Sequence, residues 1–301
     1  MGWYPPPRLR FQHRYTKHIV LFLLTFFTTT FSQVFFILML TGDVRLFVRL
    51  INPQMFVAGL WYSIPVLAIL GAHEFGHYYY CRRYNVDATL PFFLPAPIQS
   101  GTFGAVIRIR EAFPNRSALF DIGVAGPIAG FVVLVPFLYY GVQHSQLGPV
   151  ATDQLIFYYG EPLLFKALAW LKFGTRPEGF DVMLHPTGFA AWWGMLATSL
   201  NLLPFGQLDG GHIAYAVLGK RARYVSLLTL GAVLLLTVFS RSWLVTAILL
   251  VVMTLIFGFR HPRPIDDVSP VGRGRTIIAI IAAIIFILCF TPVPVDIIGP
   301  K

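Results

Sequence analysis

The sequence predicts an all-α polytopic membrane protein, with about six to seven transmembrane helices and a small membrane-associated β-segment between the second and third. Composition is the first observation: 56% of the 301 residues are hydrophobic and 12% are charged, whereas a soluble domain carries about 25% charged residues. Apolar runs of the length that a bilayer requires are the second observation. A short glycine-rich, β-branched stretch between two of these runs is the third. We expect residues 1–301 to form a single membrane domain.

Seven apolar runs carry the helix prediction. The first is expected to remain as a helix and not to be a cleaved signal peptide, because no small-residue cleavage site follows it. A further amphipathic helix is expected at 161–172, within the longest polar interruption. The predicted spans cover residues 18–41, 55–81, 119–142, 186–203, 225–239, 243–259 and 276–292.

The β-segment is predicted from its amino-acid composition. Residues 90–97 are apolar and rich in proline, and Gly101-Thr102-Phe103-Gly104-Ala105-Val106-Ile107-Arg108-Ile109-Arg110 follows. Glycine, β-branched residues and shortness favour strands over a helix here. Such a segment has to be covered by protein or lie at the membrane interface, since lipid leaves backbone groups without partners.

The charge balance predicts an orientation. The chain carries a formal net charge of +10, which in a membrane protein marks cytoplasmic loops more often than a nucleic-acid site. Residues 1–17, 81–116, 205–223 and 260–275 emerge on one side and hold 4, 5, 3 and 4 of the 23 Lys and Arg residues, 16 in all. We therefore expect this side, and the N-terminus, to be cytoplasmic, and we expect no nucleic-acid partner.

Five residues, His73-Glu74-Phe75-Gly76-His77, form an H-E-x-x-H pattern at the end of the second run. Positions i and i+4 share one face of a helix, so both imidazoles can reach one ion. The carboxylate of Glu74 lies where it could take a proton from water. Ionisable groups in a membrane segment are costly and usually functional.

A catalytic zinc ion takes three protein ligands and keeps one open position. Asp209 is the preferred third ligand, because it follows a span that returns to the same membrane depth and is flanked by turn-forming glycines. Asp121 is interpreted as a charge at a helix N-terminus, and His212 as a packing or hydrogen-bonding residue. Whether either contributes to the site stays open at this point. His185 and His144 are expected in an exterior loop.

These residues resemble the site-2 protease family of intramembrane zinc metalloproteases. The likeness rests on HEFGH, GTFGAVIRI, GPIAG and NLLPFGQLDGGH, and it covers roughly residues 55–218. That range would be the catalytic core, with accessory transmembrane helices in 1–54 and 219–301. The chain departs from better-known members because the loop between spans three and four leaves no room for a PDZ domain. No soluble regulatory domain is expected at the C-terminus either.

The resemblance implies roles. His73, His77 and Asp209 would bind Zn²⁺, and Glu74 would be the general base and then the proton donor to the leaving amine. Asn201 stands where the family has an asparagine that steadies the substrate strand or the developing oxyanion. An unwound substrate would pair with a strand edge in the segment formed by Gly101, Thr102, Phe103, Gly104, Ala105 and Val106.

The expected reaction is hydrolysis of a membrane protein in or near its transmembrane segment, in a lipid bilayer. The alternative is a membrane metal-binding or transport protein that uses the same ligands without hydrolysis; a catalytically inactive scaffold is a weaker option. Glu74 separates them, because a transporter needs no base at that spacing. The absence of a transit-like N-terminus favours a plasma (inner) membrane. Cys81 and Cys289 are too few for a disulfide framework.

Overall fold

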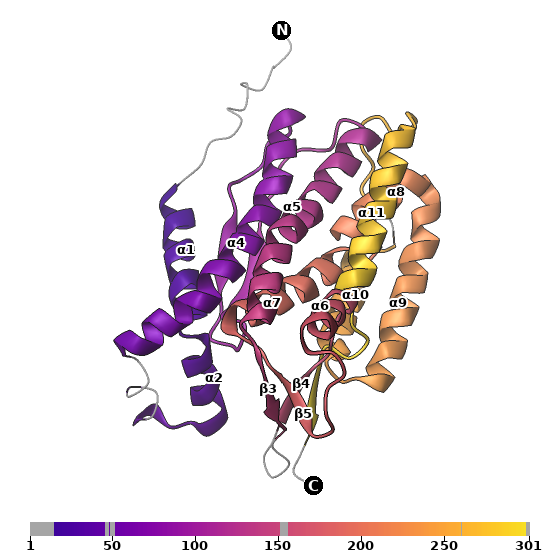
Figure 1. Ribbon diagram of the computed structural model, residues 1–301. Coiled ribbons are helices and arrows are strands. Elements are labelled where there is room, and N and C mark those ends of the chain that lie inside the picture. The colour runs from indigo at the N-terminus through magenta and orange to yellow at the C-terminus, as the bar shows by residue number, and fades with distance from the viewer. Residues whose placement is uncertain (1–14, 46–47, 49–51, 151–155, 260, 299–301) are drawn as a thin grey trace.

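The chain folds into a bundle of helices, with short two-stranded sheets beside it and at one end (Figure 1). This computed structural model describes residues 15–45, 48, 52–150, 156–259 and 261–298. The predicted cytoplasmic N-terminal residues up to 14 lie outside the described residues.

Four helices form the centre of the bundle: α4 (Pro53–Arg83), α5 (Arg116–Gln143), α7 (Pro186–Asn201) and α8 (Asp209–Leu218). Helix α5 has the most extensive contacts, because it packs against the other three. Its buried face carries large apolar side chains, and a tryptophan and a methionine from α7 belong to the same core cluster. The fully buried side chains of this core include Leu119, Phe120, Leu134, Leu138, Trp192 and Met195.

The first predicted span is helical but bent. Helices α1 (Tyr15–Thr30) and α2 (Ser32–Thr41) meet at 65°. Just before the break, the hydroxyls of Thr28, Thr29 and Thr30 each donate to the carbonyl four residues earlier. Such back-bonding weakens the helical ladder and bends helices, so one continuous helix over 18–41 was the wrong expectation.

The remaining long helices are peripheral: α9 (Ala222–Phe239), α10 (Trp243–Phe257) and α11 (Arg273–Cys289). They expose large aliphatic side chains, as a helix surface in contact with lipid does. A helix α8 and a 3₁₀ turn, η1 (Gly219–Arg221), precede α9. This stretch was predicted to be a loop, because its glycines lower the helical propensity.

Three helical stretches are long and apolar enough to cross a membrane, and the bent pair α1–α2 would make a fourth, within the described residues. Helices α7, α10 and α11 correspond to predicted spans but have only 16, 15 and 17 residues. The chain is therefore a largely helical membrane protein, and a count of six to seven spans stays a prediction.

The predicted β-segment forms a small sheet. Strands β1 (Phe92–Pro95) and β2 (Thr102–Val106) are antiparallel, with Phe93 opposite Ala105. The region between α5 and α7 also contains β3 (Gln146–Pro149), β4 (Ile156–Tyr159), α6 (Leu163–Phe173) and β5 (Phe180–Met183). Strand β3 pairs with β5, and β4 pairs with β6 (Val295–Ile298). Helix α6 matches the predicted amphipathic helix, whereas the four-residue strands were not predicted.

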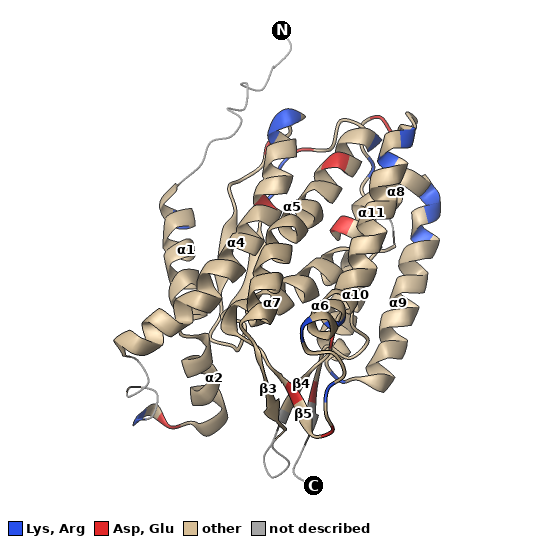
Figure 2. Cartoon of the chain, viewed as in Figure 1, with Lys and Arg blue, Asp and Glu red and all other residues tan. Residues whose placement is uncertain are grey.

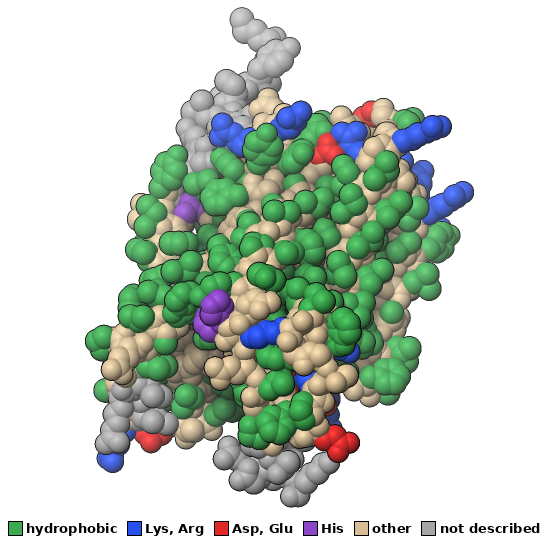
Figure 3. Space-filling model, viewed as in Figure 1, with side chains coloured by type: hydrophobic (Ala, Val, Ile, Leu, Met, Phe, Trp, Pro, Cys, Tyr) green, Lys and Arg blue, Asp and Glu red, His purple; other side chains and the backbone are tan. Residues whose placement is uncertain are grey.

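Charges gather at the two ends of the bundle (Figure 2). The flank between these ends is covered mainly by hydrophobic side chains (Figure 3). Lys and Arg crowd the end where α4 finishes and α9 begins. This distribution fits a bilayer around the middle of the bundle.

Candidate metal centre

Helix α4 presents His73 and His77 on one face. Their Nε2 atoms lie 3.1 Å apart, and both side chains are buried. One helical turn separates the two residues, as the i, i+4 spacing predicted.

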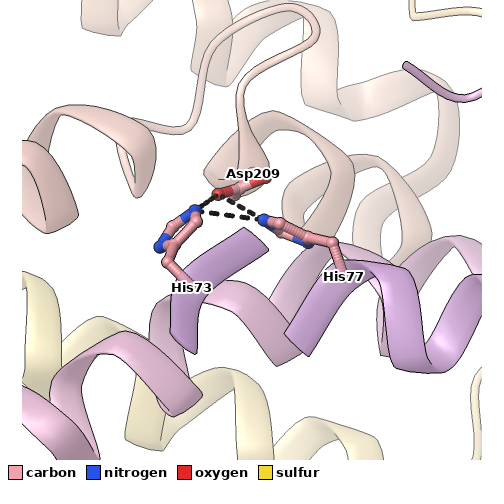
Figure 4. Close-up of side chains that lie close together, drawn as sticks. All are labelled: His73, His77 and Asp209. Carbon is pink, nitrogen blue, oxygen red and sulfur yellow. Dashed lines mark hydrogen bonds and ion pairs between the residues drawn. The ribbon is translucent and has the colours of Figure 1, made fainter. Parts of the chain in front are cut away.

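Asp209, the first residue of α8, lies opposite this pair (Figure 4). Its Oδ2 atom is 3.2 Å from Nε2 of His73 and 3.3 Å from Nε2 of His77. The turn that leads into α8 is tight, because a Cβ on Gly210 would lie 2.1 Å from the carbonyl oxygen of Leu202. The two motifs therefore meet in space.

The three ligand atoms suit a metal ion. Among the described residues, His73, His77 and Asp209 are the one group of His, Cys, Asp or Glu that could hold an ion. Tetrahedral zinc with bonds of about 2.0–2.2 Å separates its ligand atoms by about 3.3–3.6 Å. The observed separations of 3.1 to 3.3 Å lie at or slightly below the short end of that range. Two imidazoles and one carboxylate are also a donor set of catalytic zinc sites.

The ring of His77 is held in the orientation that a ligand needs. Its Nδ1 lies 2.6 Å from the carbonyl oxygen of Ile122. A carbonyl only accepts, so Nδ1 carries the proton and Nε2 keeps its lone pair toward Asp209.

Helix α5 leaves room for the centre. A Cβ built on Gly126 would lie 2.1 Å from Nε2 of His77, and one on Gly130 would lie 3.2 Å from Cβ of His73. The glycines of the GPIAG stretch thus present a helix face without side chains to the two imidazoles. From the sequence alone, this stretch is interpreted as a packing motif that can also line the site.

Glu74 is buried beside the cluster, and its carboxylate interacts electrostatically with both histidines and with Asp209. The Glu74 carboxylate lies close to the backbone of Ile107, which directly follows β2. This contact links the predicted base to the predicted substrate segment. It could not be foreseen, since it depends on how the β-segment folds back on α4.

The predicted substrate segment contains an edge strand. Within the described residues, β2 pairs only with β1, and Phe103 is 71% exposed. Gly101 precedes the strand with a φ of +71°.

Asn201, the last residue of α7, has Nδ2 3.4 Å from Nε2 of His73. The structure therefore brings Asn201 to the metal ligands.

Asp121 lies in a different network. Its carboxylate accepts two bonds from Arg275, at 2.8 Å from Nε and 2.7 Å from Nη2, and one from the hydroxyl of Tyr84. Burial, and then the bond to Asp121, raise the pKa of Tyr84, so its hydroxyl stays protonated and donates. The carboxylate of Asp121 ties the ends of α4, α5 and α11 together.

The other histidine candidates also lie outside the three-ligand group. Nδ1 of His212 is 2.6 Å from Nε2 of His261. Nδ1 of His185 accepts from the backbone of Thr187 at the start of α7, and Nδ1 of His144 contacts the carbonyl of Tyr140. The contact between His212 and His261 was missed because no spacing rule relates residues so far apart in the chain.

Comparisons with known proteins agree with this arrangement. A family model described as Peptidase family M50 matches residues 61–239. A protein described as probable zinc metalloprotease EGY2, chloroplastic, from Arabidopsis thaliana is 33% identical over 173 residues, which cover 56% of this chain and 31% of the relative. Its counterpart from Oryza sativa subsp. indica is 34% identical over 174 residues, with the same coverage. Probable zinc metalloprotease EGY1, chloroplastic, from A. thaliana is 32% identical over 242 residues, 78% of this chain and 43% of the relative. The chain thus spans less than half the length of these relatives.

Proposed function

This chain belongs to peptidase family M50, the site-2 protease family, and from that membership we propose that it is an intramembrane zinc metalloprotease. It would hydrolyse peptide bonds in or near transmembrane segments of membrane proteins, the reaction of regulated intramembrane proteolysis. The observation that carries the proposal is the convergence of three buried ligand atoms from two distant motifs.

His73, His77 and Asp209 would hold the zinc ion. When bound, the ion would polarise the scissile carbonyl and acidify the attacking water. Donor type and ligand spacing both support this assignment.

Glu74 would move the proton. Its carboxylate would take a proton from the attacking water as the new C–O bond forms, and it would then give that proton to the amine nitrogen as the C–N bond breaks. The backbone N–H of Ile107, which lies close to the carboxylate, would help to keep it aimed toward the cluster.

The substrate would enter as an extended strand. A helical segment hides its peptide carbonyls, so it has to unwind before attack, and an open strand edge can hold it extended. The segment Gly101–Val106 supports this role, because β2 is an edge strand and Ile107, the next residue, lies close to Glu74. Asn201, near His73, would steady the developing oxyanion or the substrate strand.

We propose that residues 55–218 form the catalytic core and that the remaining helices are accessory. The proposed orientation places the N-terminus and the metal centre toward the cytoplasmic side of a plasma (inner) membrane. It rests on the crowding of Lys and Arg at one end of the bundle.

The test compares Glu74→Gln with wild type, using purified protein, a single-span substrate and liposomes. We expect the variant to keep its zinc and to cleave about 10²- to 10⁴-fold more slowly, the usual contribution of general acid–base catalysis. The matched control is Glu178→Gln, because Glu178 is exposed and far along the chain from the ligands. Cleavage by Glu74→Gln at the wild-type rate would rule out the proposed mechanism. Zinc binding without cleavage by either protein would favour the metal-binding or transport alternative.

A further inference from the structure

A small basic cavity lies beside the turn that leads into Asp209 and α8. It has a volume of about 200 Å³. Gly206, from the turn before α8, and Gly211, from the first turn of α8, form part of its wall. The other lining comes from α8, from η1, from the start of α9 and from the segment after α10. These residues are Tyr215, Lys220, Ala222, Arg223, Ser226, Phe259, His261 and Arg263.

Three cations face this cavity and, among the described residues that line it, no carboxylate does. Lys220, Arg223 and Arg263 are all exposed, and none forms an ion pair within the described part of the chain. Like charges brought together at the rim of one cavity repel unless an anion lies between them.

An acid in the adjoining cavity, Asp267, is already engaged. Asp267 lines a neighbouring open cavity that shares Lys220 and Arg263 with the first. Its Oδ1 is 2.9 Å from Nε of Arg116, and its Oδ2 accepts a bond from Tyr215. Although burial opposes the change, these two bonds lower the pKa of Asp267, so its charge neutralises Arg116. Asp267 also interacts electrostatically with Arg263, although within the described residues its ion pair is with Arg116.

A buried hydroxyl in the cavity wall is loosely bonded. Ser226 is 5% exposed, and its Oγ has contacts of 3.4 Å with the backbone nitrogen of Gly206 and 3.5 Å with the carbonyl of Pro204. Bonds that long are weak. The Ser226 hydroxyl and the backbone N–H of Gly206 can therefore donate hydrogen bonds to a ligand oxygen.

We propose that this cavity binds a phosphate group. Arg and Lys are the residues that recognise phosphate, and hydroxyl and backbone N–H donors complete such sites. The volume is below the roughly 300–1,000 Å³ of sites for drug-sized ligands, so it suits a single phosphate with part of its ester.

The group can come from an anionic phospholipid headgroup or from a soluble phosphate compound. The position of the cavity suits the first source, because it lies where α9 begins and α10 ends. Just beyond it, α9 exposes apolar side chains, including Leu227 and Leu228 at 53% and 73%. Basic pockets at this level of a membrane protein bind acidic headgroups. Either source would contact the backbone close to Asp209.

The experiment has two arms and three forms of the protein. Wild type, Lys220→Gln/Arg223→Gln and the control Arg82→Gln/Arg83→Gln are purified and checked for a single species. The control removes the same charge at the same end of the bundle, where α4 finishes. In the first arm, mixed phosphatidylglycerol and phosphatidylcholine nanodiscs are used, and retained lipid is measured by native mass spectrometry. In the second, inorganic phosphate is titrated calorimetrically into phosphatidylcholine nanodiscs.

We expect wild type and the control to bind, and Lys220→Gln/Arg223→Gln to bind about tenfold more weakly or worse, since charge-assisted bonds are lost. Binding in the first arm alone identifies a lipid headgroup, and binding in the second identifies a soluble phosphate compound. The proposal is overturned if wild type binds in neither arm, or if the control loses as much as the double variant. Should the double variant not fold, Arg263→Gln carries the same prediction, because Arg263 lines the cavity from a separate segment.

Discussion

At Gly126 a single hydrogen atom faces the imidazole of His77. We predict that Gly126→Ala weakens zinc binding by about 10- to 100-fold, as the loss of a residue that orients a ligand does. The added Cβ would lie 2.1 Å from Nε2 of His77, so the ring has to turn or α5 has to move. Overpacking of this kind costs about 1–3 kcal/mol. Zinc titration with a competing chelator measures the affinity.

The control is Gly231→Ala on α9, where a Cβ would meet nothing within 4 Å. It should leave zinc binding unchanged and stabilise the helix slightly, by up to about 1 kcal/mol. Equal zinc affinity in the two alanine variants would contradict the packing of α5 against the metal centre.

Replacing Asn201 distinguishes a role in helix packing from a role in catalysis. If its amide stabilises the developing oxyanion, Asn201→Ala should lower kcat by about 10²- to 10³-fold. Zinc content and melting temperature should stay close to wild type, because the contact with His73, at 3.4 Å, is long. A fall in melting temperature with kcat unchanged would assign Asn201 to helix packing instead.

At the scale of elements, the pair between Asp121 and Arg275 joins α5 to α11. We predict that Asp121→Asn lowers the free energy of unfolding by about 1–3 kcal/mol, because both bonds from Arg275 lose their charged acceptor. Thermal unfolding in detergent measures this. Zinc content should not change. A variant with normal stability that has lost its zinc would instead make Asp121 part of the metal site.

The edge of β2 can be tested by cross-linking. Phe103→Cys, combined with Glu74→Gln to prevent turnover, should form a disulfide with a single cysteine near the cleavage site of a substrate. Phe103 is 71% exposed, whereas the natural Cys81 and Cys289 are buried. The control is Leu171→Cys on α6, which is 70% exposed. Equal cross-linking at both positions would argue against strand addition at β2.

The elements differ in how well the sequence predicted them. Long apolar runs required helices, because a bilayer leaves backbone groups no other partners, and each run does contain a helix. The helix bounds were harder to predict, because proline and threonine disturb the backbone only over the nearest turn. Helix α2, for example, diverges from α1 at the threonine cluster. The strands β3 to β6 are four residues each and carry too little periodicity to be seen.

The candidate site was predictable to a similar degree. Spacing placed His73 and His77 on one face, and the aspartate turn supplied a third ligand of the right type. The contribution of α5 was not predictable, because the fit of Gly126 against His77 depends on the packing of two helices. The approach of the Ile107 backbone to Glu74 likewise depends on tertiary structure.

At the scale of the whole molecule, the charge distribution predicts an orientation. With 16 of the 23 Lys and Arg residues assigned to one side, that side should be cytoplasmic. We predict that Ser269→Cys is protected from a membrane-impermeant maleimide in intact cells, whereas Thr175→Cys is labelled; both positions are exposed. The reverse pattern would invert the proposed topology, and labelling of both would contradict the assignment of these two loops to opposite sides.

The central claim is that the H-E-x-x-H helix and the Asp209 turn hold one zinc ion between them. X-ray absorption at the zinc edge of purified wild type and Asp209→Ala protein tests this most directly. We predict one zinc per chain, bound by two imidazoles and a carboxylate, and a loss of zinc or of the carboxylate ligand in the variant. Full zinc occupancy with an unchanged spectrum in Asp209→Ala would contradict the claim.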